Sequence, residues 1–213
     1  MENAIEVTNL TKKFKEAVVL NNVSVSFESG QVHGLIGRNG SGKTMLMKCI
    51  CGMVPPTSGE IRVHNKVIGK DVDIPENVGV IIETPGFLPG YSAFNNLKFL
   101  AAIKNKIGKE EIRKAIQSVG LDPDDKKKVG KFSLGMRQRL GLAQAIMEDP
   151  ELLILDEPMN GLDKSGVVEM RQYLLDLKAK GKTILIASHS AEDIDVLCDT
   201  VHEMDKGEIT RVR

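Results

Sequence analysis

The chain has 213 residues, of which 29 are Lys or Arg and 29 are Asp or Glu, so its formal net charge is zero. This balance gives no general electrostatic reason to expect nucleic acid or an anionic membrane surface as a partner. The length fits one domain, with room for an inserted subdomain. The sequence has no apolar run of about 18 residues or more and no signal-peptide pattern at its start. The three cysteines, Cys49, Cys51 and Cys198, match neither a disulfide framework nor a metal cluster, which predicts reduced thiols in a cytosolic protein.

Two N-terminal segments, residues 4–10 and 18–28, alternate between apolar and polar side chains. This alternation predicts antiparallel, half-exposed strands. Phe14 lies between them in a lysine-rich stretch. Its ring can stack on a base, or it can be a partly buried residue at a strand end. The pattern alone leaves both interpretations open.

A short apolar run at residues 32–36 predicts a buried strand, and the apolar residues from 45 to 51 predict a helix. The segment between them, residues 37–44, has the spacing of a phosphate-binding loop, because strand, glycine-rich turn and helix is the required order. Glycines let backbone amides approach phosphate oxygens, and the helix adds its positive dipole end. We expect Lys43 to reach the β- and γ-phosphates and Thr44 to complete a Mg²⁺ shell. The expected nucleoside triphosphate contacts of this segment come from Gly37, Arg38, Asn39, Gly40, Ser41, Gly42, Lys43, Thr44 and Met45.

The middle of the chain changes character after a small predicted hairpin near residues 61–68 and a buried strand at 78–82 that runs into Glu83. Pro and Gly dominate the loop that follows, and helical spacing then predominates up to a helix that opens at Ser133. We therefore expect an inserted helical subdomain at about 88–148. The rest of the chain, about 1–87 and 149–213, would form a core that includes the N-terminal strands.

Polar side chains follow the next two buried strands as well. Asp156 and Glu157 come directly after an apolar strand at 152–155, and His189 follows the strand at 183–188. Two carboxylates at a buried strand end are costly unless a cation compensates them. Ligands of open α/β sheets bind at the carboxyl ends of parallel strands, so the glycine-rich loop, Glu83, the two carboxylates and His189 are expected to converge on one pocket.

With these pieces in order, nearly the whole chain resembles the ATP-binding subunit of an ATP-binding-cassette (ABC) transporter. Residues 37–44 match the Walker A motif, and residues 152–157 match Walker B with its catalytic glutamate. Residues 132–139 are similar to the family signature, 160–163 to the D-loop and 187–189 to the switch histidine. The resemblance implies a single α/β domain of the P-loop NTPase class, with a RecA-like parallel-sheet core, an N-terminal antiparallel β subdomain and the inserted helical subdomain.

The resemblance also implies a role for each matching residue. Glu157 would be the general base, while Lys43 and His189 would hold the γ-phosphate and the attacking water. Two copies would form a head-to-tail dimer, expected to be a homodimer, that sandwiches two ATP molecules. The implied nucleotide contacts outside residues 37–45 are Phe14, which would stack on adenine, and Ser133, Gly135 and Asp163. The implied Mg²⁺ ligands are Thr44, Asp156 and Glu83.

The sequence departs from the family pattern at three positions. Leu134 and Met136 stand where the signature usually has Gly and Gln, and Glu83 stands where the family usually has Gln. Ser133 and Gly135 keep a hydroxyl and a backbone N–H at a helix start. A carboxylate at position 83 is a good Mg²⁺ ligand, but the γ-phosphate would repel it if the metal were absent.

The implied function is the ATP-hydrolysing motor of a membrane transporter, bound through a polytopic permease to the inner face of the plasma membrane. The loop at 87–97 would meet that permease. The motifs at 82–87 and 133–139 are most similar to the bacitracin, lantibiotic and multidrug exporter ATPases. One alternative is a soluble ABC ATPase of the translation-factor or DNA-repair kind, although those usually have two cassettes or long coiled coils. Another is a non-hydrolytic nucleotide-binding scaffold, although intact Lys43, Asp156, Glu157 and His189 argue against it.

Overall fold

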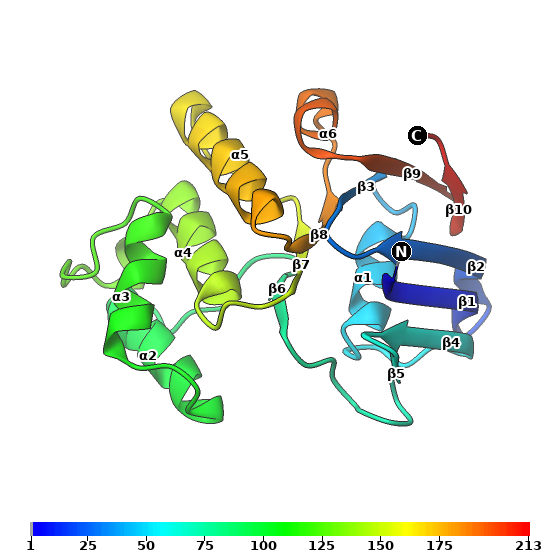
Figure 1. The fold of residues 1–213 in the computed structure, drawn as a ribbon, viewed down its shortest axis with the longest axis horizontal. Helices are drawn as coiled ribbons and strands as arrows, with labels where there is room; N and C mark the ends of the chain where they lie inside the picture. Colours follow the sequence, from blue (N-terminus) through cyan, green and yellow to red (C-terminus); the bar gives the residue numbers. More distant parts are fainter. Residues whose placement is uncertain (1) are drawn as a thin grey trace.

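The computed structural model describes residues 2–213 and contains two β-sheets (Figure 1). The larger sheet has the strand order β10-β9-β3-β8-β7-β6, in which all neighbours are parallel except β10 and β9. Its strands are β3 (Val32–Ile36), β6 (Val78–Ile81), β7 (Leu152–Asp156), β8 (Thr183–Ala187), β9 (Thr200–Asp205) and β10 (Glu208–Arg211). The smaller sheet is antiparallel, with the order β2-β1-β4-β5. It contains β1 (Asn3–Phe14), β2 (Ala17–Glu28), β4 (Ser58–Val63) and β5 (Lys66–Val67).

The helices divide into those that pack beside the sheets and those that gather at one end of the molecule. Helix α1 (Lys43–Ile50) lies between the two sheets, whereas α2 (Ala93–Lys104), α3 (Lys109–Ser118) and α4 (Leu134–Ile146) group together beyond β6 (Figure 1). Helices α5 (Lys164–Ala179) and α6 (Ala191–Leu197) follow β7 and β8, and a 3₁₀ turn covers Val129–Lys131.

Both faces of the parallel sheet are buried, and alternate residues of each central strand point into different cores. In β8, Ile184 and Ile186 pack with the helices α2 to α5, whereas Leu185 and Ala187 pack with α1 and the smaller sheet. Parallel strands covered on both faces are expected to be continuously apolar, and β7 and β8 are buried along their whole length. Polar groups in these strands are therefore concentrated at their ends.

The expected α/β class is confirmed, with a parallel sheet, a separate antiparallel sheet and helices between β6 and β7. The helical stretch before α4 is broken after Lys104, because Asn105 takes a left-handed conformation that ends α2. Strand β10 was not predicted, because its residues are mostly exposed and do not alternate clearly. The division at about 88 and 148 into core and helical subdomain remains a prediction. Residue 1, the first residue of the predicted core, lies outside the described residues.

The cysteines are all free, and burial raises the pKa of the Cys49 thiol to about 11 and that of the Cys51 thiol to about 12. Cys51 follows the last residue of α1, so it caps the helix rather than lying within it. No helix among residues 2–213 has the length and apolar character needed to cross a membrane.

Two buried histidines face one aromatic ring where the sheets meet. The rings of His33 and His202 both lie 5.2 Å from that of Phe27. His33 bonds the Thr200 hydroxyl and the backbone carbonyl of Glu28, whereas Nδ1 of His202 has no partner within the described chain. Burial, with a smaller effect of neighbouring His33, lowers the pKa of His202 to about 4, and burial also lowers the pKa of His33.

We predict that acid destabilises the protein through these histidines. The pKa of His202 lies below its ordinary value in the folded state, so the unfolded chain takes up the proton first as the pH falls. The contribution of His202 to stability is therefore complete above about pH 6.5 and is lost as the pH falls toward 4. Urea unfolding followed by circular dichroism should show about 1–2 kcal/mol less stability at pH 5 than at pH 7.5, after allowance for partial solvent screening.

The matched control is His202→Phe, which keeps an aromatic ring beside Phe27 and removes the titrating group. This variant should lose clearly less stability between the two pH values. An equal loss in both proteins would contradict the assignment to His202.

Candidate active site

The glycine-rich loop between β3 and α1 is held in a conformation that only glycine adopts easily. Gly37, Gly40 and Gly42 have φ values of 137°, 80° and 113°. A Cβ atom on Gly37 would lie 2.2 Å from the carbonyl oxygen of Met204, so no larger residue fits there. A Cβ on Gly40 would meet nothing within 4 Å, which is consistent with a loop that faces open space.

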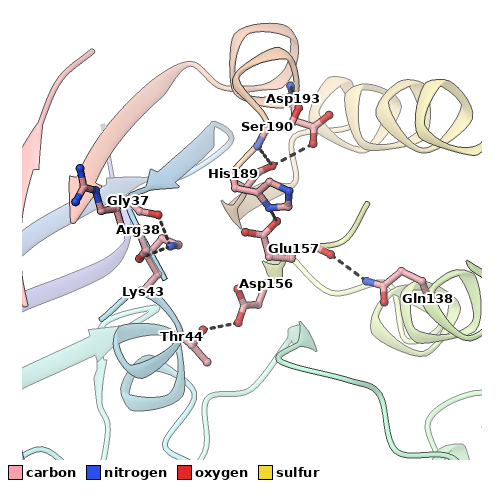
Figure 2. A network of polar contacts seen from close by, with 11 residues as sticks. Gly37, Arg38, Lys43, Thr44, Gln138, Asp156, Glu157, His189, Ser190 and Asp193 are labelled. Carbon is pink, nitrogen blue, oxygen red and sulfur yellow. Dashed lines mark hydrogen bonds and ion pairs between the residues drawn. The ribbon is translucent and has the colours of Figure 1, made fainter. Parts of the chain in front are cut away.

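Lys43 turns back over this loop. Its Nζ donates to the carbonyl oxygens of Gly37 at 2.7 Å and Arg38 at 3.2 Å (Figure 2). The Ser41 hydroxyl is buried and has no hydrogen-bond partner within residues 2–213. The loop thus presents an ammonium group and a free buried hydroxyl beside the positive end of α1, an arrangement suited to anionic oxygens.

Thr44 and Asp156 form the oxygen-rich part of the site. The Thr44 hydroxyl donates to Oδ2 of Asp156 at 2.7 Å, and Asp156 is 7% exposed at the end of β7 (Figure 2). Hydroxyl and carboxylate oxygens are suitable Mg²⁺ ligands, and Mg²⁺ commonly takes only one or two carboxylates together with substrate phosphates. The structure shows no group of three or more His, Cys, Asp or Glu for a metal anywhere in residues 2–213. The hydroxyl of Thr44 and the carboxylate of Asp156 are donors that would hold Mg²⁺ together with phosphate oxygens.

Glu157 and His189 form a second polar pair at the same edge of the sheet. Oε2 of Glu157 lies 2.7 Å from Nδ1 of His189, and the Glu157 carbonyl accepts a hydrogen bond of 3.3 Å from Nε2 of Gln138 in α4 (Figure 2). Glu157 has a φ of 50°, a left-handed conformation that is uncommon outside glycine and is often found at functional sites.

The segment that carries His189 is anchored by buried charges. Oδ2 of Asp193 accepts from the Ser188 hydroxyl at 3.1 Å, and that hydroxyl accepts from the backbone N–H of Ser190 at 3.1 Å. Arg171 of α5 donates from Nε to Oδ1 of Asp193 at 2.7 Å. This network fixes the backbone on both sides of His189, although the imidazole itself is largely exposed.

A cavity of about 420 Å³ lies beside the glycine-rich loop and the carboxylates. His189 was expected in the same pocket, but it lines a neighbouring cavity that it shares with Glu157. It brings together the predicted residues Lys43, Thr44, Glu83, Asp156 and Glu157, together with most of the glycine-rich loop. The full lining consists of Val19, Asn39, Gly40, Gly42, Lys43, Thr44, Met45, Lys48, Glu83, Asp156 and Glu157.

Glu83 does not contact Thr44 or Asp156 directly. Its Oε1 instead lies 2.6 Å from Nζ of Lys48 in α1. Sequence reasoning missed Lys48, although its place four residues after Thr44 sets both on one side of the helix. It also missed Gln138 and Arg171, because pairings between distant segments leave no local pattern.

Within the glycine-rich loop, Gly37, Arg38 and Ser41 do not line this cavity, and neither do the four nucleotide contacts predicted outside residues 37–45. Phe14 is 48% exposed, and Nζ of Lys12 lies 4.7 Å from the centre of its ring. Ser133 caps α4 by accepting from the N–H of Met136, and Asp163 caps α5 by accepting from that of Gly166. The nucleotide roles of Phe14, Ser133, Gly135 and Asp163 remain predictions, since each of them has a structural position in the isolated chain that needs no nucleotide.

The start of α4 packs against the loop before α5. A Cβ atom on Gly161, whose φ is 77°, would lie 2.5 Å from Cγ of Leu134, and one on Gly135 would lie 2.7 Å from the carbonyl oxygen of Gly161. Leu134 thus uses the space above Gly161, while Gly135 permits close backbone approach. Leu134, one of the sequence departures, couples the two segments within one chain.

The family model described as ABC transporter matches residues 20–160. An ABC transporter ATP-binding protein of Bacillus subtilis, YybJ, is 49% identical and covers 96% of this chain and 94% of its own length. The bacitracin transport ATP-binding protein BcrA of Enterococcus faecalis is 41% identical over 98% of this chain and 68% of its own. The lantibiotic transport ATP-binding protein SrtF of Streptococcus pyogenes is 38% identical over 96% of this chain and 88% of its own length.

Solved structures agree with the fold. The dimeric ATP-binding cassette MJ0796 bound to ADP and Pi superposes with a TM-score of 0.87 at 21% identity, over 98% of this chain and 99% of the other. A nucleotide-free ATP-binding cassette of an ABC transporter has a TM-score of 0.85 at 25% identity, over 100% of this chain and 92% of the other. The expected P-loop NTPase fold is confirmed.

We predict that Gly161→Ala destabilises the protein by about 1–2 kcal/mol, because a Cβ atom is strained at positive φ and also displaces Leu134. Thermal unfolding measures the loss, and ATP hydrolysis should fall with it because the start of α4 must move. The control is Gly161→Ala combined with Leu134→Ala, which removes the collision but leaves the backbone strain. Stability equal to that of the single Gly161→Ala variant would contradict the importance of the Leu134 contact.

Proposed function

Because this chain belongs to the ABC transporter family, as an ATP-hydrolysing, ATP-binding subunit, we propose that it drives export of a peptide antibiotic or a similar amphiphile through a membrane permease. The family and the ATPase activity follow from the family match and from relatives at 38–49% identity. The proposal adds the direction of transport, the substrate class and the residue roles.

The observation that carries the proposed chemistry is the meeting of Thr44–Asp156 and Glu157–His189 beside the Lys43 loop. Phosphoryl transfer depends mainly on positioning and on neutralising developing charge. Lys43 would move from its carbonyl partners to the β- and γ-phosphate oxygens. Bound Mg²⁺, held by Thr44 and Asp156, would supply further positive charge there.

Glu157 would accept the proton of an attacking water, and its position in the lining of the cavity beside the glycine-rich loop supports this role. His189 shares a hydrogen bond with that carboxylate and would orient it and the γ-phosphate. The network through Ser188, Asp193 and Arg171 would limit the movement of His189 to its side chain.

A second copy of this chain would complete the site. Ser133, Gly135 and Asp163 lie at the starts of α4 and α5, and Ser133 and Asp163 are exposed there. Two such starts, from two copies, would close over the two ATP molecules. Phe14 would stack on the adenine, for which its exposed ring is available.

The proposed permease contact is an apolar patch made by Leu88, Tyr91 and Phe99. Their exposed fractions are 50%, 47% and 45%, and the Tyr91 and Phe99 rings pack edge to face at 5.1 Å. Asn96 shapes this loop by accepting from the N–H of Leu88 at 2.7 Å. Such a patch would offer an apolar contact surface to a membrane partner. Through it, the protein would sit at the inner face of the plasma membrane.

The relatives support the substrate class. BcrA and SrtF are named for bacitracin and lantibiotic transport, and both align with nearly the whole of this chain. Transport relatives also disfavour the soluble ABC ATPase of the translation-factor or DNA-repair kind.

We predict that Glu157→Gln gives a protein that forms a dimer with ATP and Mg²⁺ but hydrolyses ATP about 10²–10⁴-fold more slowly, because the general base is lost. Analytical ultracentrifugation measures the dimer and phosphate release measures the rate. The control combines Glu157→Gln with Lys43→Ala, which should stay monomeric because it cannot hold the phosphates. A Glu157→Gln protein that stays monomeric where the wild type dimerises would count against this mechanism.

The transporter role is tested by affinity capture from detergent-solubilised host membranes, with tagged Glu157→Gln protein held in ATP and Mg²⁺ as bait. A polytopic membrane protein should be recovered in near-stoichiometric amount. The matched bait carries Leu88→Asp in addition, and it should recover much less, because a charge disrupts the apolar patch. Recovery of ribosomes or DNA-repair proteins by both baits would refute the transporter role.

A further inference from the structure

We propose that Lys48 is a positioning residue that neutralises Glu83 and so permits a carboxylate at this place in the nucleotide cavity. The inference rests on the proposed placement of the ATP phosphates beside Lys43. It concerns a residue that has no other assigned role, and it explains how this chain tolerates one of its departures from the family sequence.

The pairing is direct and lies in the cavity. Nζ of Lys48 is 2.6 Å from Oε1 of Glu83, and both residues line the space shared with Lys43, Asp156 and Glu157. Lys48 lies one helical turn beyond Thr44 in α1, on the side of the helix that faces β7. Glu83 comes two residues after Ile81, the last residue of β6, and its φ of 59° is a left-handed conformation.

The ion pair of Lys48 and Glu83 offsets part of the negative charge of the cavity. Its lining holds three carboxylates, on Glu83, Asp156 and Glu157, but only two ammonium groups, on Lys43 and Lys48. Asp156 is bonded to Thr44, Glu157 to His189, and Lys43 to backbone carbonyls. Lys48 is therefore the cation that offsets Glu83.

The pair has little value for folding. The side chain of Glu83 is 64% exposed and that of Lys48 is 24% exposed, and exposed ion pairs contribute little to stability. Its effect is expected on the triphosphate instead, because an unpaired carboxylate in the same cavity would repel the phosphate oxygens. Lys48 occupies Oε1 and leaves Oε2 of Glu83 available to a cation or to water.

The experiment is a double-mutant cycle of wild type, Lys48→Met, Glu83→Gln and the double variant. Equilibrium ATP binding is measured by calorimetry in EDTA and again in excess Mg²⁺. In EDTA, Lys48→Met should weaken ATP binding about fivefold when Glu83 is present. In the Glu83→Gln background the same substitution should change binding by about twofold or less. Excess Mg²⁺ should reduce the first effect, and Glu83→Gln should depend least on Mg²⁺.

Two further variants separate positioning from packing. Lys48→Arg keeps the cation and should restore wild-type binding. Lys66→Met removes a comparable exposed ion pair with Glu76, at 2.9 Å and outside the cavity, and should leave ATP binding unchanged. Steady-state kinetics should show the loss in KM rather than in kcat.

An equal loss of ATP binding on Lys48→Met in both backgrounds would overturn the proposal, because Lys48 would then act on the nucleotide without Glu83. Unchanged binding in both backgrounds would overturn it as well. Thermal unfolding identifies any variant that fails to fold. If Lys48→Met fails to fold, the ATP binding of Lys48→Arg and of Glu83→Gln tests the proposal instead. The result does not depend on the permease. If affinity capture recovered no membrane protein, the proposed transport role would be refuted, but the double-mutant cycle would still test the pair of Lys48 and Glu83.

Discussion

The parallel sheet is buried on both faces, and this constraint determines where chemistry is possible in the molecule. Strands β7 and β8 bury every side chain along their length, because α1 and the smaller sheet cover one face and α2 to α5 cover the other. Polar groups are tolerated in such strands only at the ends, where a partner or water is available. The carboxyl ends of β3, β6, β7 and β8 meet at one edge, and the site is built there from the loops that leave them.

Each carboxylate at that edge has its own compensating partner. Asp156 accepts from the Thr44 hydroxyl, Glu157 pairs with His189, and Glu83 pairs with Lys48. These partners come from α1 and from the segment after β8, so the packing of the helices against the sheet also sets the electrostatics of the site. The proposed reaction would exchange several of these internal contacts for contacts with phosphate oxygens and a metal.

The remaining predicted contacts would depend on a second copy of the chain. Ser133 and Asp163 cap helices in the isolated chain, and Leu134 packs over Gly161 between them. The α4 start and the loop before α5 are therefore in contact, and a second copy that closed on one of them would also meet the other. The apolar patch is made by Phe99 of α2, which belongs to the same group of helices, and by Leu88 and Tyr91 in the loop before α2. A permease bound there would be mechanically connected to the α4 start and hence to the proposed dimer interface.

The sequence by itself determined the elements and their chemistry wherever the signal is local. Apolar runs predicted β3, β7 and β8, and glycine spacing predicted the loop before Lys43, because backbone conformation and strand burial depend on adjacent residues. Only the tertiary structure decided which distant side chains pair. Gln138 with the Glu157 carbonyl, Arg171 with Asp193, and Lys48 with Glu83 join segments 19, 22 and 35 residues apart. Such pairs depend on how helices pack on the sheet, and long polar side chains reach partners that no periodicity in the sequence specifies.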